Sequence, residues 1–189
     1  MSKYVNRMRD VLMSFNRNAL EIRGEMSNSR ERFSEDYAFM EIDKLRNQLN
    51  QAAENARKQI DSIHEEAKTA AKKWAALDGK KINAADLALL KGDFDISAQN
   101  LTALVVKYWD NGTMINAIDK YIKERHIRAV YVPCLDDKLQ AYEILAKSAR
   151  GLIGSISEST GVPDDHIAGW GKSGNVSDRL ERALYGCHQ

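Results

Sequence analysis

Proline and cysteine are scarce in this sequence, with two of each among 189 residues. Because proline interrupts helices, its scarcity leaves long stretches in which a helix can continue. Cys134 and Cys187 form no CxxC motif and no Cys/His cluster, which argues against a zinc framework and predicts no metal site. Two isolated thiols without a secretory signal are typical of a reducing compartment.

Long hydrophobic runs are also absent. No stretch approaches the roughly 18 consecutive apolar residues that a membrane-spanning helix needs. Residues 1–13 are polar and charged and lack the apolar centre of a signal peptide. We therefore expect no membrane partner, and a location in the cytoplasm rather than export through a signal peptide.

An excess of charge of one sign is missing as well, because 28 basic residues meet 27 acidic ones and the net charge is +1. Residues 1–32 are mildly basic, with seven Lys/Arg against four Asp/Glu. This balance does not favour binding to nucleic acid or to an anionic membrane.

What the sequence does contain is a long heptad-like seam between residues 33 and 77. Its apolar positions follow one another in steps of three and four residues, with one extra four-residue step between Ala52 and Ile60. No glycine or proline interrupts it. The seam positions predicted to contact a partner are Ile42, Leu45, Leu49, Ala56, Ile60, Ile63 and Trp74.

A coiled-coil-like helix of this length is roughly 60 Å long, and its narrow apolar face is stabilised mainly by packing against neighbours. Residues 3–23 form another amphipathic pattern, which predicts a helix. This helix folds back on the long one as an antiparallel hairpin, or identical chains associate through the seam, and both can hold at once. Gly24 either ends the first helix or lies inside a continuous one.

Residues 80–126 predict three short helices with their own core. Asn83 is expected to cap the first helix, Asp95 or Ser97 the second, and Thr113 the third. Each cap is followed by apolar residues at helical spacing.

After these helices, the β-like stretch at 126–133 is expected to be an extended connector. Asp136 or Asp137 then opens another helix. A glycine-rich loop at 161–174 and a short helix at 178–185 follow. The predicted fold is all-α, with a helical stalk over residues 1–78 and a compact helical domain over residues 80–189.

One loop motif suggests nucleotide chemistry but fails on inspection. Gly171-Lys172-Ser173 is similar to the end of a phosphate-binding loop, yet the glycine expected five residues earlier is His166. No buried strand leads into the segment Gly169–Gly174, so we expect no cofactor. Trp170 in this loop is either a plug in the core or an exposed contact for a partner.

The acidic pairs, the histidines and the cysteines predict no catalytic site. Acids at predicted helix starts favour the helix dipole. No histidine has a second histidine three or four residues away, and His64 is expected to be exposed on the long helix. Nothing after Cys134 resembles a nucleophile turn. We therefore predict that the protein is not an enzyme.

Residues 86–123 carry a resemblance, in three segments: DLALLKG (86–92), LTAL (101–104) and KYWDNGTMINAIDKY (107–121). A long charged helix followed by this pattern resembles helical structural and assembly proteins of phages and prophages of Gram-positive bacteria. The resemblance implies a virion, scaffold or assembly role, located in the host cytoplasm during assembly or in the virion. It also implies other phage structural proteins as partners, and it carries over no catalytic residue.

The favoured hypothesis is therefore a non-enzymatic, homo-oligomeric assembly protein of phage type. One alternative is a regulatory or host-directed binding module. A second alternative is a helical nucleic-acid-binding protein, which the charge balance makes the weakest of the three.

Overall fold

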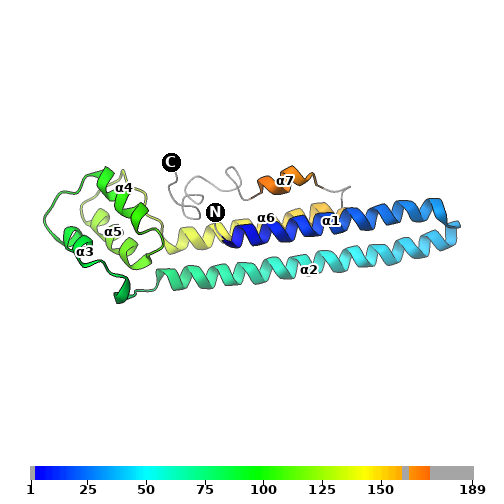
Figure 1. The fold of residues 1–189 in the computed structure, drawn as a ribbon, viewed down its shortest axis with the longest axis horizontal. Coiled ribbons are helices and arrows are strands. Elements are labelled where there is room, and N and C mark those ends of the chain that lie inside the picture. The colour runs from blue at the N-terminus through cyan, green and yellow to red at the C-terminus, as the bar shows by residue number, and fades with distance from the viewer. Residues whose placement is uncertain (1–2, 159–161, 171–189) are drawn as a thin grey trace. The chain divides into compact units, whose positions relative to one another are not determined.

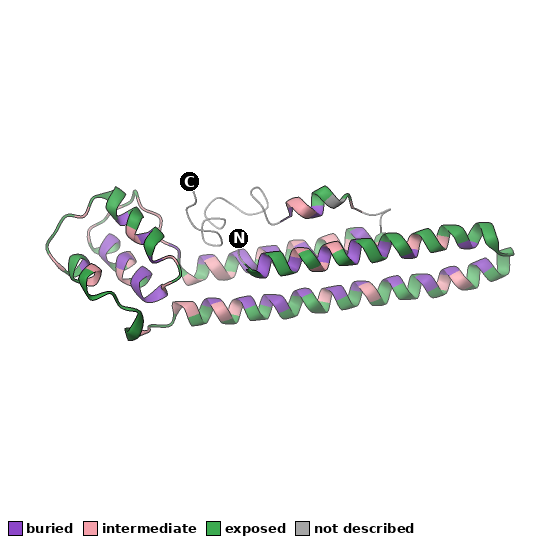
Figure 2. Cartoon of the chain, viewed as in Figure 1, coloured by how far each residue is buried: buried purple, intermediate pink, exposed green. Residues whose placement is uncertain are grey.

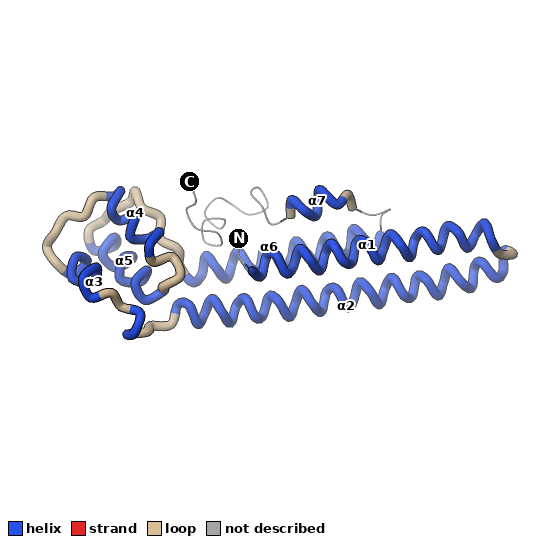
Figure 3. Tube along the Cα trace, viewed as in Figure 1, coloured by secondary structure: helices blue, strands red, loops and turns tan. Residues whose placement is uncertain are grey.

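The computed structural model describes residues 3–158 and 162–170, without the side chain of Asp164. These residues form helices and no strand, which confirms the all-α prediction (Figures 1 and 3). The predicted helix at 178–185 and the glycines at 171 and 174 lie outside the described residues. The elements are α1 (Lys3–Arg32), α2 (Glu35–Ala75), the 3₁₀ helix η1 (Gly79–Lys81), α3 (Ala84–Lys91), α4 (Ala98–Lys107), α5 (Gly112–Glu124), α6 (Leu135–Glu158) and α7 (Asp164–Gly169).

The helices form two compact units. The first contains residues 3–66 and 143–170, and the second contains residues 67–142. This division differs from the predicted one near residue 79, because the second half of α6 belongs to the same unit as α1. Its apolar face, which includes Leu145 and Ile153, is fully buried.

In the first unit, α1 and α2 pack against each other as the antiparallel arms of a helical hairpin (Figure 1). α1 continues through Gly24, which is exposed and has open space around it. The chain turns at Phe33 and Ser34, and the Ser34 carbonyl accepts a hydrogen bond from the Ala38 N–H at 2.8 Å. Figure 2 shows buried residues recurring along both helices.

The seam of α2 is buried, with two changes in its register. Steps of three and four residues connect the buried positions, and two consecutive four-residue steps occur both between Leu45 and Ala53 and between Ile63 and Ala71. Ala53 is 3% exposed, whereas Ala52 is only half-buried. The prediction placed a single extra step between Ala52 and Ile60, about two helical turns after the first observed one, because an apolar pattern does not distinguish two adjacent alanines.

α6 supplies the third helix of the first unit. Arg150 donates a hydrogen bond to the Asp61 carboxylate of α2 at 2.8 Å. From α1, Arg23 donates to the carbonyls of Ile156 and Ser157 near the end of α6. The seam is therefore packed within one chain, and its burial requires no second copy.

The second unit contains η1 and α3 to α5 around their own core. Asn83 and Ser97 cap α3 and α4 by accepting hydrogen bonds from backbone N–H groups three residues on, as predicted. Residues 127–134 form the connector, without a strand. The core of this unit consists of Leu90, Leu101, Val105, Tyr108, Met114, Ile115, Ile118, Tyr121 and Ile122.

The predicted cap of α5 is wrong by two residues. Asn111 is the cap, and its side chain accepts a hydrogen bond from the Met114 N–H. Thr113 is buried in the first turn, where its hydroxyl oxygen accepts a hydrogen bond from the Asp78 N–H at 2.8 Å. The Thr113 hydroxyl, which the local sequence pattern predicts to cap α5, is therefore engaged in a tertiary contact instead.

The loop predicted over residues 161–174 contains a short helix. α7 begins after Pro163, and Ile167 on this helix is fully buried. Proline suits the start of a helix because its fixed φ matches the helical backbone. The apolar side chain of Ile167 then anchors the helix in the first unit.

Candidate interaction surfaces

The predicted seam residues lie in the core and on no open surface. Leu49 is 7% exposed and Ile60 is fully buried, and Trp74 in the second unit is half-buried. The Trp74 indole N–H donates to the Trp109 carbonyl at 3.1 Å. The remaining predicted positions, Ile42, Leu45, Ala56 and Ile63, are buried as well.

Trp170 is a plug in the core, the first of its two predicted alternatives. Its side chain is 3% exposed, and its indole N–H donates to the Ser148 hydroxyl of α6 at 3.1 Å. The Trp170 carbonyl accepts two hydrogen bonds from Arg9 of α1, at 2.8 and 3.1 Å. An indole held in this way is not available to a partner.

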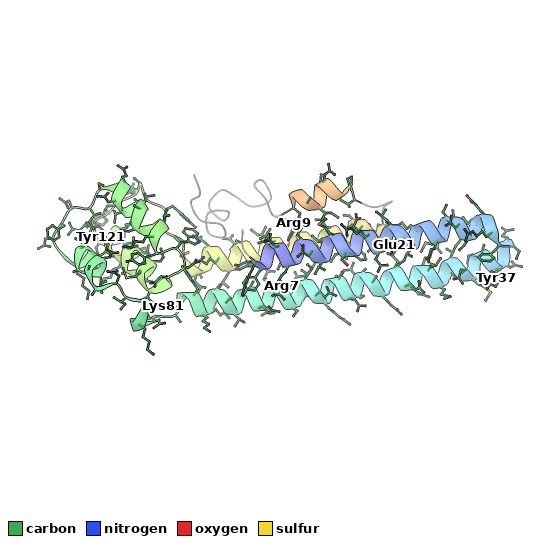
Figure 4. All side chains as sticks on the ribbon, viewed as in Figure 1. Arg7, Arg9, Glu21, Tyr37, Lys81 and Tyr121 are labelled. Atoms are coloured by element: carbon green, nitrogen blue, oxygen red, sulfur yellow. The ribbon has the colours of Figure 1, made fainter. Side chains whose placement is uncertain are left out.

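Three polar side chains of α1 bind backbone groups of the last turn of α6 and of the segment that follows it. Arg9, Asn16 and Arg23 are spaced seven residues apart and so lie on one side of the helix. Asn16 is fully buried, donates to the Val162 carbonyl at 2.9 Å and accepts from the Val162 N–H at 3.2 Å. Figure 4 labels Arg9 on α1. In the sequence, the only sign of these contacts is Asn16, a polar residue within the apolar face of the helix at residues 3–23.

His64 is buried, so the prediction that it is exposed is wrong. It is 4% exposed, and its Nε2 lies 3.2 Å from the Glu143 carboxylate of α6. The contact becomes an ion pair when the imidazole is protonated. The two-in-seven seam pattern gave no sign that α6 would cover this side of α2.

The four acidic pairs are Glu65/Glu66, Asp93/Asp95, Asp136/Asp137 and Asp164/Asp165, and in the first three at least one member has a structural partner. Glu66 pairs with Arg7 of α1, and Asp95 pairs with Arg125 at 3.0 Å. Asp137 accepts a hydrogen bond from the Tyr131 hydroxyl at 3.0 Å. Among residues 3–158 and 162–170, no cluster of His, Cys, Asp and Glu could hold a metal ion.

Cys134 is exposed, but its thiol lacks the lowered pKa of a nucleophile. Its sulfur accepts a hydrogen bond from the Asp137 N–H in the first turn of α6. Burial raises the pKa of the Cys134 thiol above its ordinary value. A catalytic cysteine has the opposite shift, because the thiolate is the nucleophile.

Lys138 of α6 lies against two indole rings in the second unit. Its ammonium nitrogen is 4.3 Å from the ring centroid of Trp74 and 5.2 Å from that of Trp109. Burial lowers the pKa of Lys138 from 10.5 to about 8, although the charge of Asp110 opposes the shift. The sequence placed both tryptophans in the core but gave no indication that a lysine would join them.

Four large apolar side chains are exposed at the turn between α1 and α2 and in the first turns of α2. The exposed fractions are 45% for Phe33, 55% for Tyr37, 64% for Phe39 and 69% for Met40. The rings of Phe33 and Tyr37 are in contact, with centroids 4.9 Å apart. We call these four residues the tip patch, and Figure 4 labels Tyr37 within it.

A second exposed group follows the end of α2. Leu77 is 79% exposed and Ile82 is 40% exposed, and the exposed Lys80 and Lys81 lie between them in η1. We call these four residues the loop patch. Figure 4 labels Lys81. Exposed apolar groups of this kind mark interaction sites more often than isolated apolar residues do.

An apolar groove of about 360 Å³ lies between α3 and α4 in the second unit. Leu89, Ile96 and Leu104 provide its apolar lining, and Lys107 lies at its edge. Lys107 is paired with Asp86 of α3 at 2.7 Å, which ties the two helices together.

The comparisons found no matching family model, no matching curated protein and no matching solved structure. No helix among the described residues is long and apolar enough to cross a membrane. The case for function therefore depends on the residues themselves.

Proposed function

We propose that this chain is a non-enzymatic structural or assembly protein that acts by protein–protein contact, as a virion or morphogenesis component of a phage or prophage. One observation carries the proposal. The long seam is packed within the chain, while four large apolar side chains, including Phe39 and Met40, remain exposed together in the tip patch. Burying such a group on a partner is favourable by about 25 cal/mol for each Å² of apolar surface.

The placement of the reactive side chains supports a non-enzymatic role. Glu66 and Asp95 are engaged in ion pairs, and the pKa of Cys134 is raised rather than lowered. The phage assignment is supported by the resemblance of residues 86–123 and by the long helical hairpin. Its expected partners are other phage structural proteins and further copies of the chain.

Sedimentation of phage particles tests the proposal. The producing cells are induced, particles and their precursors are separated on a density gradient, and the chain is identified by mass spectrometry in each fraction. We expect the chain to travel with particles or precursors. Its absence from both, with all of it in the slow fractions, would contradict a virion or morphogenesis role.

The gradient is repeated with two matched variants. Phe39→Ser removes an exposed ring of the tip patch, and Phe94→Ser removes a ring that is 65% exposed but lies outside both patches. We expect loss of co-sedimentation only for Phe39→Ser. Equal behaviour of the two variants would refute a specific role for the tip patch.

A further inference from the structure

The two exposed patches flank the same helix and differ in charge. Residues 33–41 around the tip patch contain three acids and no base. Glu41 is paired with Lys44, but Glu35 and Asp36 have no ion-pair partner within 4.0 Å among the described residues. Both side chains are exposed at the start of α2.

The loop patch has the opposite character. Lys80 and Lys81 are exposed, and neither is in an ion pair within the described part of the chain. Asp78 is the only acid of residues 77–82, and its carboxylate caps η1 by accepting a hydrogen bond from the Lys80 N–H at 3.0 Å. The patch therefore presents two ammonium groups between Leu77 and Ile82.

We propose that the tip patch of one copy docks on the loop patch of a second copy. In this contact Phe39 and Met40 bury their apolar surface against Leu77 and Ile82. The lysines of the loop patch then face Glu35 and Asp36. The inference rests on the proposed function and deepens it, because it names the surfaces through which copies of the chain assemble.

Charge decides in favour of a contact between unlike patches. Two tip patches would bring four unpaired carboxylates together, and two loop patches would bring four ammonium groups together, so either symmetric contact is disfavoured. The occupant proposed for each patch is therefore the unlike patch of a second copy.

The helix dipole explains only part of this pattern. Acids in the first turn of a helix and lysines near its end, such as Lys72 and Lys73, are favourable in any helix. This accounts for charge at the two ends of α2. It does not account for exposed apolar groups beside each set of charges, since exposing Met40 and Leu77 to water stabilises nothing.

A contact between unlike patches leaves one patch open at each end of the pair. Such heterologous contacts add further copies until the chain of molecules closes into a ring or extends as a filament. The expected product is thus an open or cyclic series of copies rather than a two-fold dimer. Added salt weakens the association, because the charges are at the surface.

The test uses two variants of the full chain, each with one patch blocked. The tip variant carries Phe39→Ser and Met40→Ser, and the loop variant carries Leu77→Ser and Ile82→Ser. All four side chains are at least 40% exposed, so the substitutions leave the core intact. Phe94→Ser is the matched control, and circular dichroism with thermal melting confirms that each variant is folded.

Light scattering coupled to gel filtration gives the mass of each sample over a hundredfold range of concentration. The unmodified chain and the control are expected to grow in mass with concentration. Each blocked variant alone is expected to remain a monomer. An equimolar mixture of the two variants is expected to form a dimer and nothing larger, because only one pair of complementary patches remains.

Three results would overturn the inference. These are an unmodified chain that stays monomeric at every concentration, a mixture that contains only monomers, and a blocked variant that still self-associates. Failure of the proposed function is a separate outcome. A monomeric chain that still travels with particles refutes only the inference, whereas a self-assembling chain that is absent from particles refutes only the virion role.

Discussion

Replacement of Gly112 by alanine tests the closest approach in the second unit. Gly112 is the buried first residue of α5, where it lies against the last turn of α2. A Cβ at this position would be 2.0 Å from the Trp74 carbonyl oxygen and 3.2 Å from the Ala75 Cα. These are backbone atoms, so no rotamer change relieves the overlap. α5 and the last turn of α2 must move apart.

The expected cost follows from what this movement disturbs. Overpacking of a tight site costs about 1–3 kcal/mol. Separation also strains the hydrogen bond from the Asp78 N–H to the Thr113 hydroxyl, which contributes about 1 kcal/mol. Alanine recovers up to about 1 kcal/mol through its better helix propensity. We expect Gly112→Ala to lower the free energy of unfolding by about 2–3 kcal/mol.

Urea unfolding followed by circular dichroism measures this change. Gly24→Ala is the matched control, because Gly24 lies in the middle of α1 with nothing within 4 Å of a Cβ. The control is expected to stabilise the chain by about 0.5–1 kcal/mol. If Gly112→Ala were as stable as Gly24→Ala, the close approach of α5 to Trp74 would be wrong.

Three further predictions concern the core. Asn16→Leu leaves the N–H and the carbonyl of Val162 without their hydrogen-bond partner, so it should lower the free energy of unfolding in urea by about 2 kcal/mol. An unchanged free energy of unfolding would contradict this contact. Leu49→Asp buries a charge in the seam and should lower the melting temperature sharply, so an unchanged temperature would refute the burial of the seam. The pKa of Lys138 is lower in the folded chain than its ordinary 10.5, so stability should rise with pH from about 8 towards 10.5. Lys138→Met should remove this rise, and equal pH profiles by urea titration would count against it.

Local patterns in the sequence were sufficient for the helices and most of their caps. Asn83 and Ser97 satisfy backbone groups three residues away, so their role needs no tertiary information. The predicted cap of α5 was wrong because Asn111 and Thr113 are both residue types that can cap a helix. Only the Asp78 N–H, which is distant in sequence, decides between them.

The pattern of a single helix could not predict which of its faces are buried by helices distant in the sequence. The pattern of α2 showed a narrow apolar seam, and the burial of His64 depends on α6, which arrives some eighty residues later in the chain. For the same reason the sequence left two alternatives for Trp170, and its hydrogen bonds with Arg9 and Ser148 decide between them. The boundary predicted near residue 79 likewise ignored the return of α6 to the first unit.

The sequence did not predict the exposed patches, because the spacing of apolar residues does not show which of them another helix covers. Phe39 and Met40 read as ordinary positions at the start of a helix, and Leu77 reads as the last residue of the seam. The structure shows that all three side chains are exposed. The apolar spacing in the sequence therefore predicts the helices, whereas the exposed fractions in the structure identify the candidate contacts.

The central claim is that one chain packs its own seam and leaves its apolar surface for partners at the two patches. The most direct measurement is the thermal unfolding midpoint of the tip variant, Phe39→Ser with Met40→Ser, over a hundredfold range of protein concentration. We expect the same midpoint at every concentration, because folding of a single chain does not depend on mass action. A midpoint that rises steadily with concentration would show that the seam is closed by a second chain.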